Sequence, residues 1–396
     1  MKTRTHLHLK KIIAVLPVPF IVVACGGGDG GSDNTQTNGT LHVAMTDVPS
    51  CGFDHVFVTV NKVRVNSSGN AGDNDSGWTD IALPTPQKVD LLSLTNGVLF
   101  DIGRAPLPAG QYQQVRLVLN ANQGNTLANS VVVSGTTNEV PLATPSATQS
   151  GFKIIQPFTV PANTLVDLIL DFNACKSIVQ QGNGSYSLKP VVTATLLTVS
   201  GTISGFVPAA QAGATVYAEQ NGQIIRGTVA DANGQFVLTP LVQSSTGGTY
   251  DVVVVDNKLP SGHATGIIRA VPVTASATTT VSTSAAPITL PTSATNTVSG
   301  TATASAQASV RALQTISSLS YEIASTNARL DTGAYSLALP AAAPLIGTYS
   351  PALPIALSAT SVAGQYSVQA TSASGATQTS AANVSGGSQS GVNFNF

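Results

Sequence analysis

Five aspartates in the first part of the chain are the clearest candidates for acid–base chemistry. They lie near the ends of predicted strands, at Asp47, Asp54, Asp90, Asp167 and Asp171. Two carboxyl groups about 5–10 Å apart can act as acid and base in glycoside hydrolysis. Asp167 and Asp171, however, are four positions apart on one face of a predicted strand, so their α-carbons are about 13 Å apart and cannot form a direct pair. We therefore expect structural carboxylates at turns, with a hydrolase site in the first domain as the alternative.

Metal binding has two candidate sites, both incomplete. Asp73 and Asp75 alternate as oxygen ligands do at the start of a calcium loop, but the further acids of an EF-hand are missing. A solvated hairpin loop is the preferred interpretation. His42 and His55 could meet across paired strands, yet a two-histidine site would still need further ligands. We predict no resident metal and no cofactor.

The sequence lacks the local motifs of the common hydrolases and nucleotide-binding proteins. G-x-S-x-G, H-E-x-x-H and G-x-x-x-x-G-K-[ST] do not occur. No catalytic residue is therefore assigned, and we predict a chain that is not an enzyme.

The elements that would position these residues are strands. Val- and Thr-rich runs are broken by Gly, Asn, Asp and Pro, which is typical of an all-β protein. In His55–Val65 the valines change parity midway, with Val56, Val58 and Val60 on one face and then Val63 and Val65 on the other. A β-bulge near Asn61-Lys62 would bring all five into the core.

The N-terminal segment predicts export and an anchor. Four basic residues in Met1–Lys11 precede an uncharged run, Ile12–Ala24, which is too short to span a bilayer as a helix but suits a signal peptide. Val22-Val23-Ala24-Cys25 resembles the lipobox of bacterial lipoproteins. The resemblance implies cleavage before Cys25 and lipidation of its sulfur, and Gly26 implies sorting to the outer membrane. The alternative is an ordinary signal peptide with a chance cysteine. Residues 25–40 would form the lipidated cysteine and a glycine-rich flexible tether.

The two other cysteines, Cys51 and Cys175, then form an even pair in an oxidising compartment. We predict a disulfide between them, and two buried free thiols are the alternative. Removal of residues 1–24 leaves 13 Lys and Arg against 18 Asp and Glu. This acidic balance argues against nucleic acid as a partner.

Residues 41–197 resemble a bacterial family catalogued as domain of unknown function 4382. Five segments carry the resemblance in order: TDVPSCGFDHVFVTVNKVRV, KVDLLSLTNGVLFDIG, LPAGQYQQVRLVL, LVDLILDFNACKSI and YSLKPVV. The family has no assigned reaction or binding residues to transfer. We expect this domain to be an antiparallel β-sandwich.

The rest of the chain contains a repeat. Val199-Ser200-Gly201-Thr202 recurs at 298–301, the DANGQFVL turn of 231–238 recurs at 331–337, and Gly248–Val252 recurs at 364–368. The last offset is longer, so the second copy carries an insertion. The first copy resembles the carboxypeptidase-regulatory-like, prealbumin-type sandwich, which usually serves as a spacer or a binding platform. We therefore expect two further sandwiches, 198–287 and 298–396, joined by a linker at 288–297.

Three functions remain open on the sequence. The leading hypothesis is a noncatalytic lipoprotein of the outer membrane, facing the periplasm or the cell surface, that binds glycan or an envelope protein. The second is the hydrolase with a carboxylate site in the first domain. The third is a structural spacer that holds the first domain away from the membrane.

Overall fold

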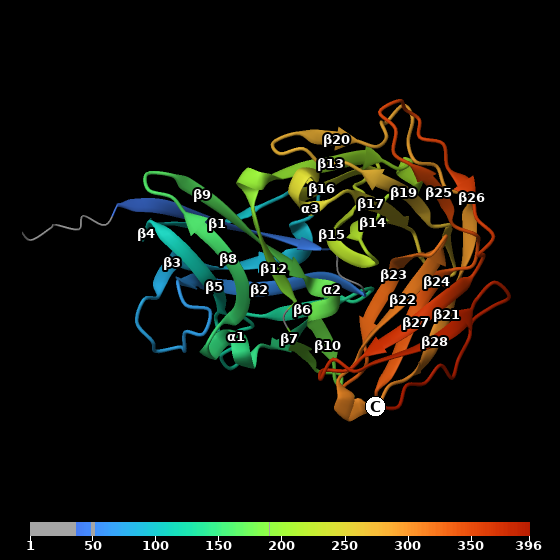
Figure 1. The fold of residues 1–396 in the computed structure, drawn as a ribbon. Helices are drawn as coiled ribbons and strands as arrows, with labels where there is room; N and C mark the ends of the chain where they lie inside the picture. The colour runs from blue at the N-terminus through green and yellow to red at the C-terminus, as the bar shows by residue number, and fades with distance from the viewer. Residues whose placement is uncertain (1–36, 49–51, 190) are drawn as a thin grey trace, which may run out of the picture. The chain divides into compact units, whose positions relative to one another are not determined.

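The computed structural model describes residues 37–48, 52–189 and 191–396 (Figure 1). The predicted signal peptide, Cys25, most of the tether and Cys51 lie outside this range, and so does the side chain of Cys175. The regular structure is almost entirely β-strand, which confirms the all-β fold class. Among the described residues no helix has the length and apolar character needed to cross a membrane. Buried apolar side chains gather in three cores.

The first domain is a sandwich of a four-stranded and an eight-stranded sheet. The four-stranded sheet has the order β12-β9-β1-β4, with β1 (Asn38–Val48), β4 (Phe100–Pro108), β9 (Leu165–Asn173) and β12 (Val192–Leu196). The second sheet has the order β10-β11-β7-β6-β2-β5-β8, and β3 also pairs with β2. Its strands are β2 (Phe53–Asn66), β3 (Thr79–Asp90), β5 (Gly110–Leu119), β6 (Ser130–Val133), β7 (Glu139–Ala143), β8 (Phe152–Val160), β10 (Ile178–Gln180) and β11 (Tyr186–Leu188). Short helical turns lie between strands: η1 (Leu91–Ser93), α1 (Pro145–Gln149) and α2 (Ala174–Ser177).

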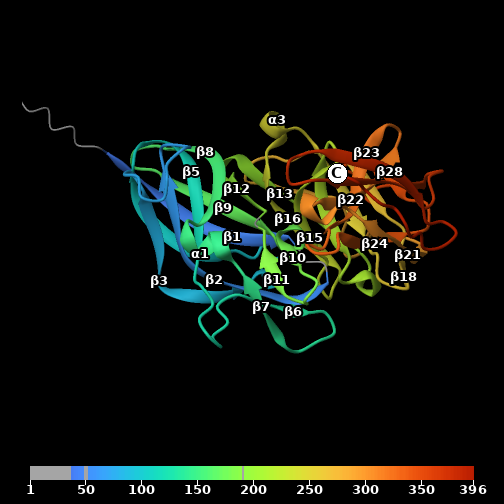
Figure 2. The same cartoon turned by 90° about the horizontal axis from the view of Figure 1, so that it is seen from below.

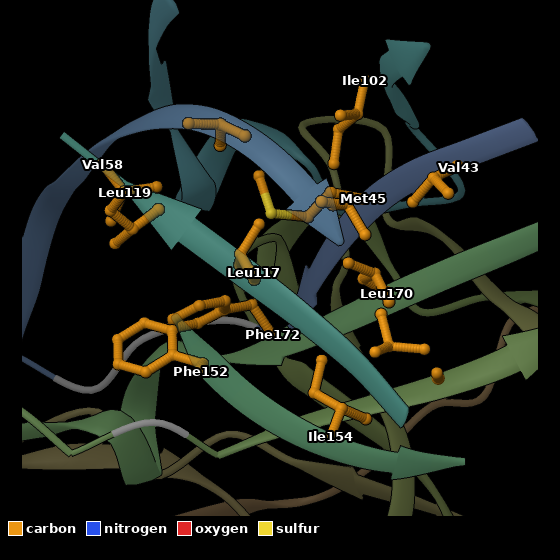
Figure 3. Packing of buried hydrophobic residues seen from close by; sticks show 14 of the residues in the cluster. Val43, Met45, Val58, Ile102, Leu117, Leu119, Phe152, Ile154, Leu170 and Phe172 are labelled. Carbon is orange, nitrogen blue, oxygen red and sulfur yellow. The ribbon is translucent and has the colours of Figure 1, made fainter. Parts of the chain in front are cut away.

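The bulge predicted in the valine-rich strand is present. The register of β2 against both β3 and β5 shifts between Val60 and Lys62. All five valines on either side of the shift are fully buried, because the extra residue restores their direction toward the core. Figure 3 shows side chains from both sheets meeting in this core, among them Val58 and Leu117 from one sheet and Met45 and Phe172 from the other.

The expected purely antiparallel arrangement of the first domain is wrong for two pairs of strands, β1 with β9 and β7 with β11, which run parallel. β1 and β9 run parallel and side by side, with Thr40 opposite Leu165 and Val48 opposite Asn173 (Figures 1 and 2). The reason is that the chain crosses from the eight-stranded sheet after β8 and enters the other sheet as β9. The strand that starts there meets β1, from which it is distant in sequence.

The expected tether also ends earlier than Thr40, since Asn38 and Gly39 already pair with β4.

The second and third domains share one strand pattern. The second contains β13 (Ser200–Phe206), β14 (Thr215–Gln220), β15 (Gln223–Val229), β16 (Gln235–Val242), β17 (Tyr250–Val255), β18 (Ser261–His263), β19 (Gly266–Val271) and β20 (Thr278–Thr280). The third contains β21 (Thr292–Thr301), β22 (Ser309–Ile316), β23 (Leu319–Asn327), β24 (Ala334–Pro340), β25 (Leu345–Thr348), β26 (Ser358–Ala359), β27 (Gln365–Thr371) and β28 (Thr377–Asn383). The turns η2 (Leu197–Val199), η3 (Ala209–Gln211), α3 (Ser244–Gly247) and η4 (Ala304–Ala306) complete this part.

The repeat seen in the sequence is a repeat of topology. β13 pairs with β16 as β21 pairs with β24, and β14 pairs with β15 and β17 as β22 pairs with β23 and β27. The repeated tyrosine has the same role in both copies. Tyr250 Oη donates to the carbonyl of Val242 at 2.9 Å, and Tyr366 Oη donates to that of Pro340 at 2.7 Å. In each case the phenol bonds to the last residue of a repeated strand, β16 in the second domain and β24 in the third.

The two copies are joined more closely than a linker would allow. β25 and β26, which lie in the insertion of the third domain, extend the second domain's sheet in the order β15-β14-β17-β19-β25-β26. The expected linker, 288–297, instead buries Ile288 and Leu290 and then enters β21, which also pairs with β18. The Ser, Thr and Ala content of this segment suggested a linker. Its apolar residues, Ile288 and Leu290, instead complete the core of the second domain.

Candidate functional site

The five candidate aspartates of the first domain each have partners among the described residues. Asp90 caps η1 by accepting from the amide of Leu92 at 3.2 Å, and its other oxygen lies 2.7 Å from His55 Nδ1. Asp54 accepts from the amide of Gly135 at 3.1 Å, and buried Asp47 accepts from that of Ala174 at 3.1 Å. The Asp90–Leu92 contact is a local cap, whereas the other three join segments that are distant in sequence.

His42 lies between two carboxylates. Its Nδ1 is 2.6 Å from Asp167 Oδ1, and its Nε2 is 3.1 Å from Asp101 Oδ1. Both ring nitrogens therefore contact carboxylates from other strands. The side chain bridges β1, β4 and β9. His42 and His55, predicted as a possible metal pair, have different aspartate partners.

Asp73 and Asp75 also have partners other than a cation from solution. Asp73 pairs with Arg116, whose guanidinium lies over the Trp78 ring at 4.8 Å from the centroid. Asp75 accepts from the amide of Gly72 at 2.8 Å. Both carboxylates shape the loop between β2 and β3. Within the described residues, His, Cys, Asp and Glu side chains form no group of three or more suited to a metal ion.

Asp171 makes a buried ion pair with the second domain. Its partner is Arg226 of β15, and the two side chains are 5% and 3% exposed. Arg226 also donates to the carbonyl of Pro240 from Nη2 at 3.1 Å. Burial raises the pKa of Asp171 to about 6, although the Arg226 guanidinium acts in the opposite direction. Asp171 therefore fastens β9 to the second domain.

Glu322 of β23 is the centre of a charged cluster in which all three domains take part. Its side chain is fully buried, and its Oε1 lies 2.7 Å from Nζ of Lys176 in the first domain. Its Oε2 lies 3.3 Å from Nη1 of Arg311 in the neighbouring strand β22. Its amide donates at 3.0 Å to Oε2 of Glu219, which belongs to the second domain. One buried residue thus has polar contacts with all three domains, two through its side chain and one through its amide.

Sequence reasoning missed Glu219 and Glu322. Glu322 stands between Tyr321 and Ile323, and Glu219 follows Val216-Tyr217-Ala218 and precedes Gln220. In a chain with only 9% charged residues, an acid inside an apolar strand is the available signal. It indicates burial against another element, since buried acids are rare without a partner.

A groove of about 520 Å³ lies in the third domain along β27 and β28. Its lining carries hydroxyl, amide and apolar groups and no charged side chain. The polar side chains are those of Thr315, Gln365, Tyr366, Ser367, Asn383 and Gln389. Asn383 and Gln389 are held together where the amide of Asn383 donates to Gln389 Oε1 at 2.9 Å. The volume of the groove falls within the range of small-ligand sites.

Comparison with known proteins identifies the first domain. Residues 38–190 match the family model described as "Domain of unknown function (DUF4382)". This match confirms the resemblance derived from the five sequence segments. The DUF4382 segment ends close to β12, whose strand completes the four-stranded sheet.

Other comparisons give more distant similarities. The crystal structure of GBS52, the minor pilin of the gram-positive pathogen Streptococcus agalactiae, aligns with 63% of this chain and 95% of its own, at 13% identity and a TM-score of 0.18. A Ca²⁺-stabilised adhesin with which an Antarctic bacterium binds ice aligns with 89% of this chain and 75% of its own, at 12% identity and a TM-score of 0.14. No curated protein matches the chain.

Proposed function

We propose that this chain is a noncatalytic protein of the bacterial cell envelope that binds a neutral glycan in the third-domain groove. The observation that carries the proposal is the lining of that groove, in which amides and hydroxyls face a volume of about 520 Å³ without a charged side chain. Neutral sugars offer many hydroxyl donors and acceptors and no charge, so a neutral polar lining complements them.

The contacts of the first-domain acids support a noncatalytic role. A hydrolase would need two carboxyl groups facing one substrate. Asp90 instead caps a turn, Asp167 holds His42, and Asp171 pairs with Arg226. The charged groups are used to hold strands and domains together.

We place the protein on the outer membrane, with the lipid on Cys25 as its anchor. The support is the sequence of the N-terminal segment, in which a basic head and an uncharged run precede Cys25. Two or more acyl chains on such a cysteine would give a stable attachment. The glycine-rich stretch after Cys25 would give the three domains freedom to reach a glycan.

The proposal can be tested with the full chain purified in detergent and screened against immobilised neutral and acidic glycans. Ala381 is exposed and lines the groove, so Ala381→Trp should fill it and abolish the binding of neutral glycans. Thr377→Trp, at an exposed position of the same strand outside the groove, is the matched control and should bind like wild type. Binding that is equal in both variants would overturn the groove as the site. A complete lack of glycan binding would favour the spacer hypothesis instead.

A further inference from the structure

Two carboxylates of the second domain stand directly opposite each other in neighbouring strands. Glu219 of β14 and Asp251 of β17 are partners in the antiparallel register, so their side chains leave the same face of the sheet. Like charges in such a pair are destabilising. The pair is therefore unfavourable when both carboxyls are ionised, and either protonation of one of them or a bound cation relieves it.

The two carboxylates line a pocket of about 240 Å³. Its mouth is formed by two turns, one at Asn221-Gly222 between β14 and β15 and the other at Ser318 between β22 and β23, together with Leu319, the first residue of β23. Ser320 and Tyr321 complete the polar lining. Asn221 and Ser318 are accessible to solvent, so a small ligand could reach the carboxylates from outside.

Glu219 has one oxygen in use and one without a partner. Its Oε2 accepts from the amide of Glu322 at 3.0 Å. Its Oε1 is buried and has no hydrogen-bond partner among the described residues. The whole residue is only 1% exposed. A buried carboxylate oxygen normally has a partner, and leaving one unpaired costs on the order of 1–3 kcal/mol. Because Glu219 lines the pocket, its unpaired oxygen is a candidate acceptor for a ligand that enters there.

Among the described residues, no cation forms an ion pair with Glu219. On β14 its neighbour is Tyr217, on β17 it faces Asp251, and on β23 it faces Glu322 and Tyr321. Lys176 of α2 and Arg311 of β22 are both ion-paired with Glu322. Burial and the Asp251 carboxylate raise the pKa of Tyr321, and the charge of Arg269 of β19 opposes this rise. Glu219 therefore stays without an ion-pair partner within the described part of the chain.

We propose that this pocket binds a primary ammonium group, with Glu219 Oε1 as its main acceptor. An ammonium has three donors. Glu219, Asp251 and the hydroxyl or amide oxygens at the mouth can accept them. A divalent metal fits less well, since Ca²⁺ takes six to eight oxygen ligands and the described residues offer no group of three or more His, Cys, Asp or Glu. The ammonium could belong to an amino sugar or to a lysine side chain.

Binding of this kind would release a proton. Burial, the largest cause, together with the Glu322 and Asp251 carboxylates, raises the pKa of Glu219 well above its ordinary value, against the lowering effects of the Glu322 amide and Lys176. The carboxyl is therefore protonated in the empty pocket below its raised pKa. When an ammonium enters, Glu219 loses its proton to solvent and forms the ion pair. Affinity should then rise with pH until the carboxyl is ionised in the empty pocket as well.

The test is calorimetric titration of the full chain with glucosamine and with Nα-acetyl-lysine amide, in two buffers of different ionisation enthalpy. N-acetylglucosamine is the matched control because it keeps the sugar ring and lacks the charge. We expect at least one of the two amines to bind with a release of up to one proton, and N-acetylglucosamine not to bind here. Which amine binds more tightly identifies the source of the ammonium. Failure of both amines to bind, or proton-free binding of the neutral sugar at this pocket, would overturn the proposal.

Variants separate this pocket from the third-domain groove. Glu219→Gln should abolish proton release and weaken amine binding at least tenfold, whereas Glu139→Gln, an acid on the first domain's surface, should change neither. Leu319→Arg places a cation at the exposed mouth without altering a buried group, so it should also weaken binding if Glu219→Gln fails to fold. Ala381→Trp fills the other groove and should leave amine binding unchanged. Amine binding that survives both Leu319→Arg and a folded Glu219→Gln would contradict the site.

Discussion

Nζ of Lys176 lies 2.7 Å from Oε1 of Glu322, although the first residue belongs to the DUF4382 segment and the second to the third domain. Glu322 is fully buried, whereas Lys176 is 26% exposed at its side chain. Asn327 supports the same contact by donating from Nδ2 to the carbonyl of Lys176 at 2.7 Å. Specific polar contacts therefore attach the first domain to the third, in addition to the chain that connects them.

We predict that Glu322→Gln destabilises the chain strongly, because it leaves Lys176 and Arg311 without their anion. Breaking a buried pair in this way typically costs about 3–5 kcal/mol. A double-mutant cycle of Glu322→Gln with Lys176→Met, measured by urea unfolding, should give a coupling free energy of about 1–3 kcal/mol.

The matched control for this cycle is the pair formed by Lys88 and Glu139, which meets at 2.6 Å with both side chains about one-third exposed. Its coupling should stay below about 1 kcal/mol, as is usual for exposed pairs. Equal coupling in the two cycles would show that the buried pair does not hold the domains together.

A second prediction concerns pH and the Asp171–Arg226 pair. The pKa of Asp171 is about 6 in the folded chain, against an ordinary value of 3.8. Between these values the folded carboxyl holds a proton that the unfolded chain has lost, so stability falls as pH rises from about 4 to about 6. The loss attributable to Asp171 can reach about 3 kcal/mol. Urea unfolding at several pH values should show that this slope disappears in Asp171→Asn.

Two further variants check the assignment of the slope. Asp54→Asn alters an acid of the same domain that is exposed and should keep the wild-type slope. Arg226→Met removes the cation that lowers the pKa of Asp171, so the fall in stability should extend to higher pH. A slope that is the same in wild type and Asp171→Asn would refute the assignment.

The sequence predicted features that depend on local chemistry. The parity change of the valines in β2 predicted the bulge, and the Asp and Gly of the repeated turns predicted the hairpin at Asp231–Gly234, where the amide of Gly234 donates to the carbonyl of Asp231 at 2.9 Å. Both signals lie within a few residues of the structure they determine.

Features that depend on distant partners were missed. The parallel pairing of β1 and β9 joins segments far apart in sequence, and β25 leaves the third domain to extend the second domain's sheet. Glu219 and Glu322 become a site because β14 and β23 meet, which no local pattern specifies. Asn96 is a similar case, since its Oδ1 accepts from the amide of Val237 in the second domain at 3.0 Å.

The bulge itself can be tested by deletion. Deleting Asn61 would remove the extra residue and turn Val63 and Val65 away from the core, because a one-residue shift reverses every side chain of a strand. Loss of two buried valines should cost at least about 3 kcal/mol. Deletion of Thr137, in an exposed loop, is the control and should cost far less. A mild effect of the Asn61 deletion would mean that the strand can realign without the bulge.

The two cysteine predictions are testable by mass spectrometry of the protein purified from the envelope. Cys51 and Cys175 should resist alkylation until a reductant is added. Before reduction, their peptides should be detected as one disulfide-linked species. Free alkylation of both in the unfolded, unreduced chain would establish two thiols instead.

The anchor requires its own variant. In wild type, the N-terminal peptide should begin at Cys25 and carry acyl chains, and the protein should sediment with outer membranes. Cys25→Ser should lose the acyl mass and the membrane association together. A Cys25→Ser chain that still sediments with outer membranes would show that the lipid is not what holds it there.

The most direct test of a noncatalytic glycan-binding role is to incubate the full chain with glycans isolated from bacterial envelopes. Mass spectrometry would then follow bound and cleaved sugar in the same sample. We predict that neutral glycans are retained intact, and that Ala381→Trp releases them while Thr377→Trp does not. The appearance of shortened glycans that depends on the protein would contradict the account and point to a hydrolase.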